Sequence, residues 1–272
     1  MSQTPTNDAA VPGMIALILL DAPAKPDADE VIAAARAICP ELATELSPVN
    51  LPGAIADAPL LFKLGEGLGP VLSIDSPAPI PELTEIAKMS WWWPEAGAAI
   101  EGHKAHLVIT RMSAGEDDSS DSRFDEAAYV TLLTAALVKV TSARAVFWGP
   151  GMKIADPAVF AEMTAILDKD MPPVLLWIDF RLFEGEGETI GMITRGLEAF
   201  TGREMEIEPT DNLDAQTMVD RGMSLIAYLV TDGDTVSDGD TMGSNETEII
   251  HVRLEDRKDE PNVFILTVEK AA

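Results

Sequence analysis

The chain has 272 residues, of which 46 are acidic and 19 are basic, so its formal net charge is −27. This charge argues against binding to DNA, RNA or an anionic membrane surface, because phosphate groups are bound by patches of Lys and Arg. It favours rapid encounter with a basic protein partner, although acidity also serves solubility alone. The apolar fraction of 47% excludes a disordered chain. A chain of this length buries roughly 70–75% of its unfolded surface, so it needs no stabilising cross-link.

Cysteine content and the N-terminal sequence indicate the compartment. Cys39 is the single cysteine, which excludes an internal disulfide and a cysteine-rich zinc site and fits a reducing cytosol. Residues 1–13 lack the pattern of a signal peptide and are expected to form a disordered tail. The apolar run Met14–Leu20 is far shorter than the roughly 20 residues that span a bilayer. We therefore expect a cytoplasmic protein.

The first half, residues 14–112, alternates strand-like and helix-like patterns. Met14–Leu20 is continuously apolar, which is typical of a strand buried on both faces. Asp27 and Glu30 form a capping-type pair that predicts a helix ending before Pro40. Further strands are expected at 59–64, 70–75 and 106–112, with helices at 81–89 and 94–104. The order β-α-β-β-α-β predicts a ferredoxin-like (split β-α-β) half.

The second half, residues 124–272, follows an acidic linker at 113–123. Its expected elements are, in chain order, a helix at 124–141, a strand at 144–148, a helix from 156 to 167, strands at 174–183 and 205–208, a helix at 213–230, and strands at 248–254 and 262–269. The segment 189–200 stays ambiguous. We predict an α/β (α+β) protein with two tandem ferredoxin-like halves, whose predominantly antiparallel or mixed sheets are covered by helices.

Two histidines three residues apart are the most suggestive chemical group. His103 and His106 could share a helix face and bind a metal, with His251 or Asp179 as a distant third ligand, since catalytic zinc usually has three protein ligands. However, His106 falls at the start of a strand, which breaks that shared face. The alternative is a helix-to-strand corner whose histidines bond to the backbone.

Three adjacent tryptophans, Trp91, Trp92 and Trp93, cannot all face one core, because neighbours on a helix diverge by about 100°. At least one is expected at the surface, where tryptophan favours partner or ligand contacts. The alternative is a packed corner between the two halves.

Several glycine-rich segments resemble ligand loops without matching them. The segment 232–240 does not fit the EF-hand spacing in either frame and is expected to be a turn. Gly149-Pro150-Gly151 and the glycines at 65–69 lack the phosphate-loop pattern. Carboxylates such as Glu204, Glu206 and Glu208 could pair for acid–base chemistry, but chance pairing is the default in so acidic a chain. The sequence thus indicates no cofactor and no complete catalytic set.

A series of short motifs resembles the bacterial family named domain of unknown function 4261. They are Trp93-Pro94 with His103-Lys-Ala-His106; Ala145 to Gly149 with Asp156-Pro157 and Phe160; Thr189-x-Gly191 with Phe200-Thr-Gly202 and Glu204-x-Glu206; and Asp238 to Gly243 with Ile250-x-Val252-Arg253. The resemblance runs from about Met14 onward. The segment 189–200 is longer than the family pattern, which leaves the strand register over 189–202 open. The resemblance supplies no catalytic residues to carry over.

The leading hypothesis is a non-catalytic binding protein, an acidic partner of a basic protein in the manner of immunity proteins. It rests on the charge, the expected exposed tryptophan and the missing catalytic set. The competing hypothesis is a metal-dependent hydrolase that uses His103 and His106.

Overall fold

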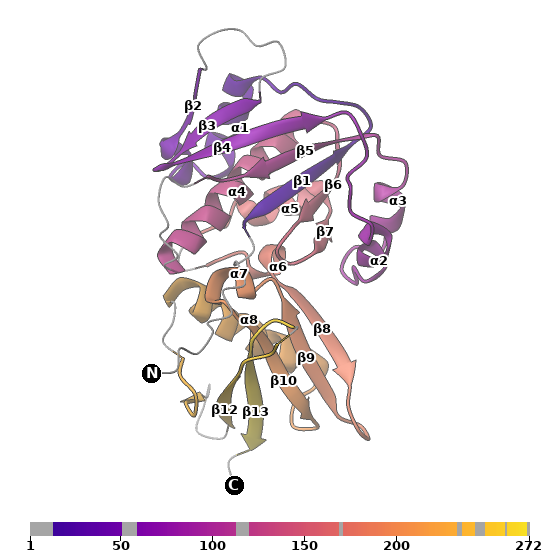
Figure 1. Cartoon of the computed structure of the whole chain (residues 1–272), viewed down its shortest axis with the longest axis vertical. Coiled ribbons are helices and arrows are strands. Elements are labelled where there is room, and N and C mark those ends of the chain that lie inside the picture. The colour runs from indigo at the N-terminus through magenta and orange to yellow at the C-terminus, as the bar shows by residue number, and fades with distance from the viewer. Residues whose placement is uncertain are drawn as a thin grey trace, which may run out of the picture.

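The computed structural model describes residues 13–50, 59–112, 120–168, 171–232, 236–242, 248–258 and 260–270. Two β-sheets lie one beyond the other along the long axis of the molecule (Figure 1). The protein is therefore a mixed α+β protein. The described residues do not include the expected tail 1–13, apart from Gly13. They also leave out most of the expected linker 113–123.

Sheet 1 has seven strands in the order β2-β3-β4-β5-β1-β6-β7, and every neighbouring pair is antiparallel. Its strands are β1 Ile15–Leu20, β2 Leu46–Pro48, β3 Leu60–Leu64, β4 Gly67–Ile74, β5 Ala105–Thr110, β6 Ala143–Trp148 and β7 Lys153–Ala155. The apolar run at the N-terminus forms the central strand β1, as its continuous apolar pattern predicts.

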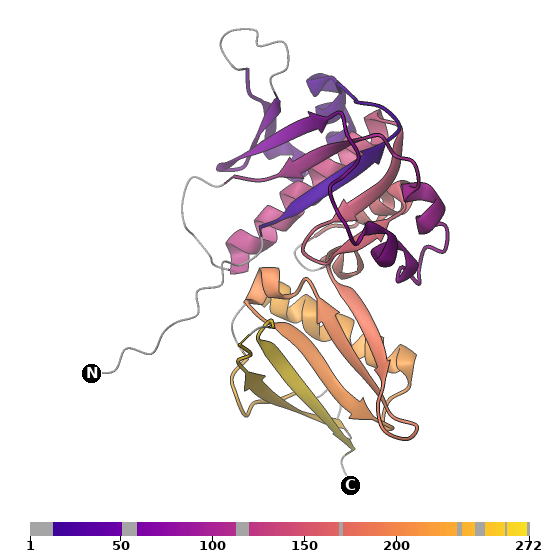
Figure 2. The ribbon, with the colours of Figure 1, turned by 45° about the vertical axis from the view of Figure 1, so that its right-hand side comes forward.

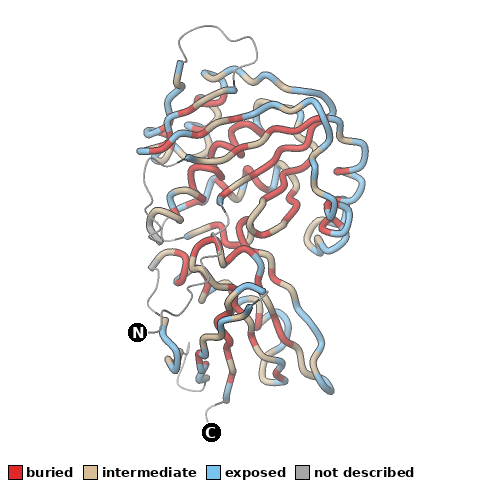
Figure 3. Tube along the Cα trace, in the orientation of Figure 1, coloured by how far each residue is buried: buried red, intermediate tan, exposed pale blue. Residues whose placement is uncertain are grey.

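Helices cover both faces of sheet 1. One face of β1, with Ala16 and Ile18, belongs to a core that also contains residues of α1 (Ala28–Ile38), α4 (Ser120–Val140) and α5 (Pro157–Thr164). The other face, with Leu17 and Leu19, packs against α2 (Leu83–Lys88) and α3 (Ala96–Ile100). The 3-10 helix η1 (Leu42–Glu45) links α1 to β2. Figure 3 shows the resulting concentration of buried residues along β1, β6 and α4.

Sheet 2 has six strands in the order β11-β12-β13-β10-β9-β8. They are β8 Asp179–Glu184, β9 Ile190–Arg195, β10 Glu204–Thr210, β11 Thr241–Met242, β12 Glu248–Glu255 and β13 Val263–Lys270, with the short helices α6 Val174–Trp177 and α7 Glu198–Thr201 at its upper end. Only β10 and β13 are parallel neighbours.

A single long helix, α8 (Ala215–Asp232), packs against one face of sheet 2 (Figure 2). A Cβ atom on Gly222 would lie 2.4 Å from Met192 Cε, so this glycine lets the helix approach the sheet closely. The described residues place no helix on the opposite face. That face carries Glu204, Glu206 and Glu208 of β10, of which Glu204 is buried. They alternate with Met205 and Ile207, which are buried on the other side of the strand.

The expected ferredoxin-like topology is not found in either sheet, which corrects that prediction. A split β-α-β half would close within residues 14–112. Instead β1 lies between β5 and β6, because the chain returns after residue 112 to add β6 and β7 to the same sheet. Sheet 1 therefore draws strands from both sides of the expected linker 113–123.

Two segments differ from the expected elements. The expected strand 174–183 is split into the one-turn helix α6 and the strand β8. Lys153 explains the split, because its ammonium donates hydrogen bonds to the carbonyl oxygens of Leu175 and Ile178 at the end of that helical turn, at 2.7 and 2.9 Å. The ambiguous segment 189–200 contains the strand β9 and the start of α7.

Candidate functional site: the cleft between the sheets

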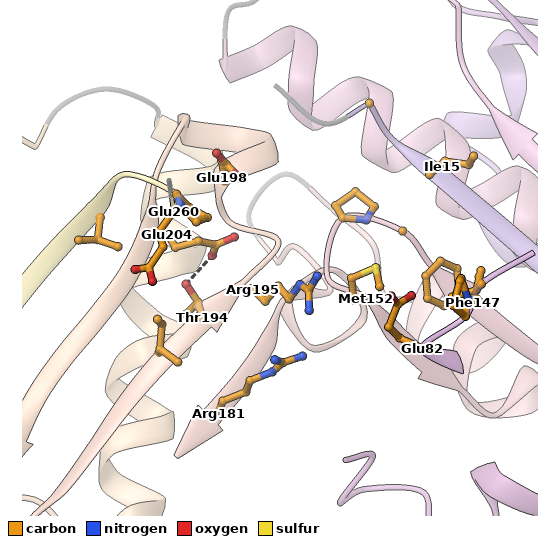
Figure 4. Close-up of a pocket in the computed structure, with 18 of the residues that line it drawn as sticks. Ile15, Glu82, Phe147, Met152, Arg181, Thr194, Arg195, Glu198, Glu204 and Glu260 are labelled. Carbon is orange, nitrogen blue, oxygen red and sulfur yellow. Dashed lines mark hydrogen bonds between the residues drawn. The ribbon is translucent and has the colours of Figure 1, made fainter. Parts of the chain in front are cut away.

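A cleft of about 890 Å³ lies between sheet 1 and the helix-free face of sheet 2. Apolar side chains from the sheet 1 side, among them Ile15, Phe147 and Met152, line one wall. The facing wall is charged and includes Arg181 and Arg195 (Figure 4). The volume falls within the range of about 300–1,000 Å³ that is typical of small-molecule sites.

The pairing of β8 with β9 brings two arginines together. Asp179 is opposite Arg195, and Arg181 is opposite Ile193. Residues two apart on a strand share a face, so Arg181 and Arg195 are diagonal neighbours on the side of sheet 2 that faces the cleft. Figure 4 shows both guanidinium groups directed toward the wall that holds Met152 and Glu82.

These two guanidinium groups are incompletely paired. The Nε atom of Arg181 donates to Asp179 Oδ2 at 2.8 Å, but its Nη2 atom is buried without a hydrogen-bond partner. Among the described residues, the guanidinium group of Arg195 has no hydrogen bond or ion pair, although its backbone pairs with β8. Burial, followed by the nearby charge of Arg181, lowers the pKa of Arg195, and the carboxylates of Glu204, Asp179 and Glu82 act in the opposite direction.

Glu204 is a buried carboxylate in the same wall and is already fully engaged. It accepts hydrogen bonds from Thr194 Oγ1 at 2.7 Å, Gly196 N at 2.6 Å and Leu197 N at 3.1 Å. Burial raises the pKa of Glu204, and these hydrogen bonds oppose the shift. Its carboxylate thus holds the turn between β9 and α7 in place.

Two glycine turns set the approach of the two walls. Gly196 has φ 107° in the β9–α7 turn, and a Cβ atom there would lie 2.8 Å from the Cα of Gly151. A Cβ on Gly151 would lie 2.6 Å from the carbonyl oxygen of Trp177. Only glycine permits backbone contact this close. The Gly149–Gly151 segment is therefore a turn, as expected, since Met152 N donates to Gly149 O at 2.9 Å.

Lys153 lies beside the cleft and is a polar group that the sequence reasoning missed. Its side chain is buried, its Nζ atom lies 4.5 Å from the centroid of the Trp92 ring, and it bonds to the two carbonyls at the end of α6. Burial lowers its pKa to about 8, against the effect of Asp179. No sequence signal marks Lys153, because β7 is only three residues long.

The candidate metal ligands are not brought to one point. His103 bonds through Nδ1 to Ile100 O at 2.7 Å and accepts from Ala78 N at 2.9 Å, while His106 Nδ1 bonds to Ser76 O at 2.8 Å. His251 lies on β12 of the other sheet, 3.4 Å from Glu269. Within the described residues, no group of three or more His, Cys, Asp or Glu could hold a metal ion. The expected alternative, a corner whose histidines bond to the backbone, is the arrangement found for His103 and His106.

The three tryptophans separate as their spacing predicts. Trp91 is 66% exposed, whereas Trp92 and Trp93 are half-buried and pack against different hydrophobic clusters. Trp91 follows α2, whose C-terminal end adjoins the start of β8 near Asp179 and Arg181.

The far end of β8 carries a second surface of interest, which we call the acidic hairpin. It consists of the exposed apolar residues Leu182 and Phe183 and the exposed carboxylates of Glu184, Glu186 and Glu188. It forms the turn between β8 and β9 at the edge of sheet 2.

The glycine- and aspartate-rich loop is described over residues 236–240, which form a turn that leads into β11. Asp240 Oδ2 accepts from Ser237 N at 2.7 Å, and Asp238 Oδ1 accepts from Leu254 N at 2.9 Å. The Asp240 bond closes the turn locally, as turn chemistry predicts, and the Asp238 bond attaches the turn to β12. The segments 233–235 and 243–247 lie outside the described residues.

The fold and the cleft define a mixed α+β protein with a cavity between two sheets. Residues 193–267 match the family described as a domain of unknown function (DUF4261), which confirms the resemblance over these residues. The matched region begins within β9 and ends within β13, so it includes Arg195 and Glu204 but not Arg181. No curated protein and no solved structure matches the chain. In the described residues, no helix is both long and apolar enough to cross a membrane.

Proposed function

We propose that this is a non-catalytic binding protein that recognises a basic partner protein through its acidic surface. The observation that carries the proposal is the acidic hairpin, where three exposed carboxylates flank exposed Leu182 and Phe183 at a sheet edge. Leu182 and Phe183 are consecutive strand residues on opposite faces, so each offers an apolar side chain beside the carboxylates. Such a surface favours a partner segment that carries Lys or Arg beside an apolar side chain.

The cleft supports a binding role over a catalytic one. Glu204 and Lys153 are buried titratable side chains at or beside the cleft, and both are used in structural hydrogen bonds. Glu204 holds the β9–α7 turn, and Lys153 bonds to carbonyl oxygens at the end of α6. A general acid or base must instead reach a substrate proton. His103, the centre of the hydrolase alternative, uses both ring nitrogens on the backbone, so that alternative gains no support.

Trp91 is the proposed apolar anchor at the other end of β8. Its 66% exposure is unusual for so large an apolar side chain, and α2, which it follows, adjoins the start of the strand that ends in the acidic hairpin. Tryptophan is enriched among the residues that dominate binding energy. The single cysteine, Cys39, is consistent with a cytoplasmic setting for such a partner.

Affinity capture with matched variants tests the proposal. The wild-type chain and the triple variant E184Q/E186Q/E188Q are immobilised and exposed to lysate at low and moderate salt. The control is E66Q/E101Q/E162Q, which removes the same charge from exposed positions elsewhere. We expect a captured protein rich in Lys and Arg that is released by salt and lost only with the hairpin variant or with Trp91→Ala. Equal capture by both triple variants, or no salt-sensitive partner, would contradict the proposal.

A further inference from the structure

The incompletely paired arginines of the cleft, Arg181 and Arg195, are unexpected in so acidic a chain. With 46 acidic and 19 basic residues, most cations should find a carboxylate partner. Arg257, on the same wall, does so, with Glu206 and Glu255 each at 2.9 Å. Arg195 has no such partner among the described residues, and Arg181 leaves its buried Nη2 atom unbonded. Two adjacent cations with free donors form a site that an anion would complete.

We propose that the cleft binds a small organic oxyanion, a carboxylate or phosphate monoester with an apolar body, whose oxygens pair with Arg181 and Arg195. The guanidinium group presents its N–H donors in a planar fork that matches such oxygens. The anion would add negative charge beside both guanidinium groups and relieve the repulsion between the two cations.

The opposite wall fits the apolar body of this ligand. Ile15, Phe147 and Met152 face the arginines across the cleft (Figure 4). Met152 has φ 46°, in the left-handed region that a residue with a Cβ rarely adopts. Such backbone strain is found more often at ligand sites than elsewhere.

The carboxylates near the cleft leave the two arginines available. Glu204 is held by Thr194, Gly196 and Leu197, Asp179 takes only the Nε atom of Arg181, and Glu260 lies 3.7 Å from Arg257. Burial raises the pKa of Glu198 above its usual range. Glu82 remains on the opposite wall and acts electrostatically on Arg195. Glu82 should therefore weaken anion binding, and its removal should strengthen it.

Titration of the full chain with matched probes tests the site. Benzoate and phenyl phosphate carry an anion on an apolar body, inorganic phosphate lacks the body, and benzyl alcohol lacks the charge. Calorimetry gives the affinity, and the Nε–Hε NMR signals of Arg181 and Arg195 report the place of binding. We expect benzoate or phenyl phosphate to shift both signals and to bind more tightly than the other two probes.

Three variants separate the site from general electrostatics. Arg195→Gln should weaken binding about tenfold or more, which is the usual effect of losing a charge-assisted pair. Glu82→Gln should tighten binding severalfold. Arg253→Gln removes the same charge from an exposed position of sheet 2 outside the cleft and should leave binding unchanged.

The proposal is overturned if no anionic probe shifts the Arg195 signal, or if benzyl alcohol binds as tightly as benzoate. It is also overturned if Arg253→Gln weakens binding as much as Arg195→Gln while thermal unfolding shows that both variants are folded. Arg195 lies outside the acidic hairpin, so loss of anion binding should leave capture of a basic protein intact. The two proposals can therefore fail separately.

Discussion

The two sheets differ in how many of their faces are covered by helices. Sheet 1 has helices on both sides, and its central strand β1 is apolar along its whole length. Sheet 2 has α8 on one side, and β10 alternates buried Met205 and Ile207 with outward glutamates. A strand between two layers has no water-facing side, whereas a strand with one covered face needs polar side chains on the other. The cleft forms where the fully covered sheet meets the half-covered one.

The two sheets should differ most in the free energy of unfolding that is lost when a side chain is truncated. The side chains compared lie on the face of sheet 1 that packs against α2 and α3 and on the helix-free face of sheet 2. Leu19 on β1 is fully buried there, and Leu19→Ala should lower the free energy of unfolding by about 2–5 kcal/mol. Glu269 lies on the open side of sheet 2 with a 63% exposed side chain, and Glu269→Ala should change it by less than about 0.5 kcal/mol. Urea unfolding of both variants checks this. Similar costs would show that the open face of sheet 2 is covered in solution.

Lys153 is a buried cation in the mostly apolar interior of sheet 1, so the stability of the protein should depend on pH through this residue. Its pKa falls from 10.5 in the unfolded chain to about 8 in the folded protein. The unfolded state therefore binds more protons between these values, so stability should rise as pH increases from about 8 toward 10. The full shift corresponds to about 3 kcal/mol.

The Lys153 effect can be isolated with Lys153→Met. Urea midpoints measured from pH 7 to 10 should rise more steeply for the wild type than for the variant. Parallel curves would mean that Lys153 does not titrate in this window.

The variant Glu204→Gln tests whether a carboxylate in the charged wall of sheet 2 stabilises the fold. Glu204→Gln places an amide where the carboxylate now accepts from Gly196 N and Leu197 N. One donor would lose its partner, so the free energy of unfolding should fall by about 1–3 kcal/mol. The exposed change Glu269→Gln is the control and should be nearly neutral. Chemical denaturation of the pair measures the difference, and equal stabilities would contradict this role.

The smallest expected change in the free energy of unfolding is that of Arg195→Gln, and its sign is opposite to that of Leu19→Ala and Glu204→Gln, which lower stability. Arg195→Gln removes a cation that repels Arg181 and has no partner among the described residues. The free energy of unfolding should stay unchanged or rise by up to about 1 kcal/mol, as is common when a binding group is neutralised. Thermal and urea unfolding measure it. A loss above about 1 kcal/mol would assign Arg195 to the stability of the fold.

Local patterns predicted the elements where neighbouring residues decide the structure. Asp27 caps α1 by accepting from Asp29 N and Glu30 N, and Asp156 caps α5 in the same way, ahead of Pro157. The apolar run of β1 likewise needs no distant partner to be recognised. Strand order could not be obtained this way, because the return of β6 to β1 depends on packing between segments far apart in the sequence.

The cleft could not be predicted for the same physical reason. Arg181 and Arg195 become neighbours only through the register of β8 and β9. The apolar stretch before β8 favoured one long strand, and the hydrogen bonds from Lys153 override that preference over 174–177. Glu204 was visible as a carboxylate, but its burial depends on the fold of the β9–α7 turn.

Trp177 links the two sheets, so that they are expected to unfold together. Its ring lies 5.6 Å from the Phe124 ring and 5.3 Å from the Phe200 ring, and its Nε1 atom donates to Thr131 at 2.8 Å. Trp177 thereby connects α4, which packs on sheet 1, to α7, which precedes β10 in sheet 2. All of these elements belong to one continuous hydrophobic cluster. Cutting the chain between the sheets would expose the Trp177 indole on the fragment that retains it and separate it from partners on the other. Melting should therefore occur as one cooperative transition, and neither sheet is expected to persist as an autonomous folding unit.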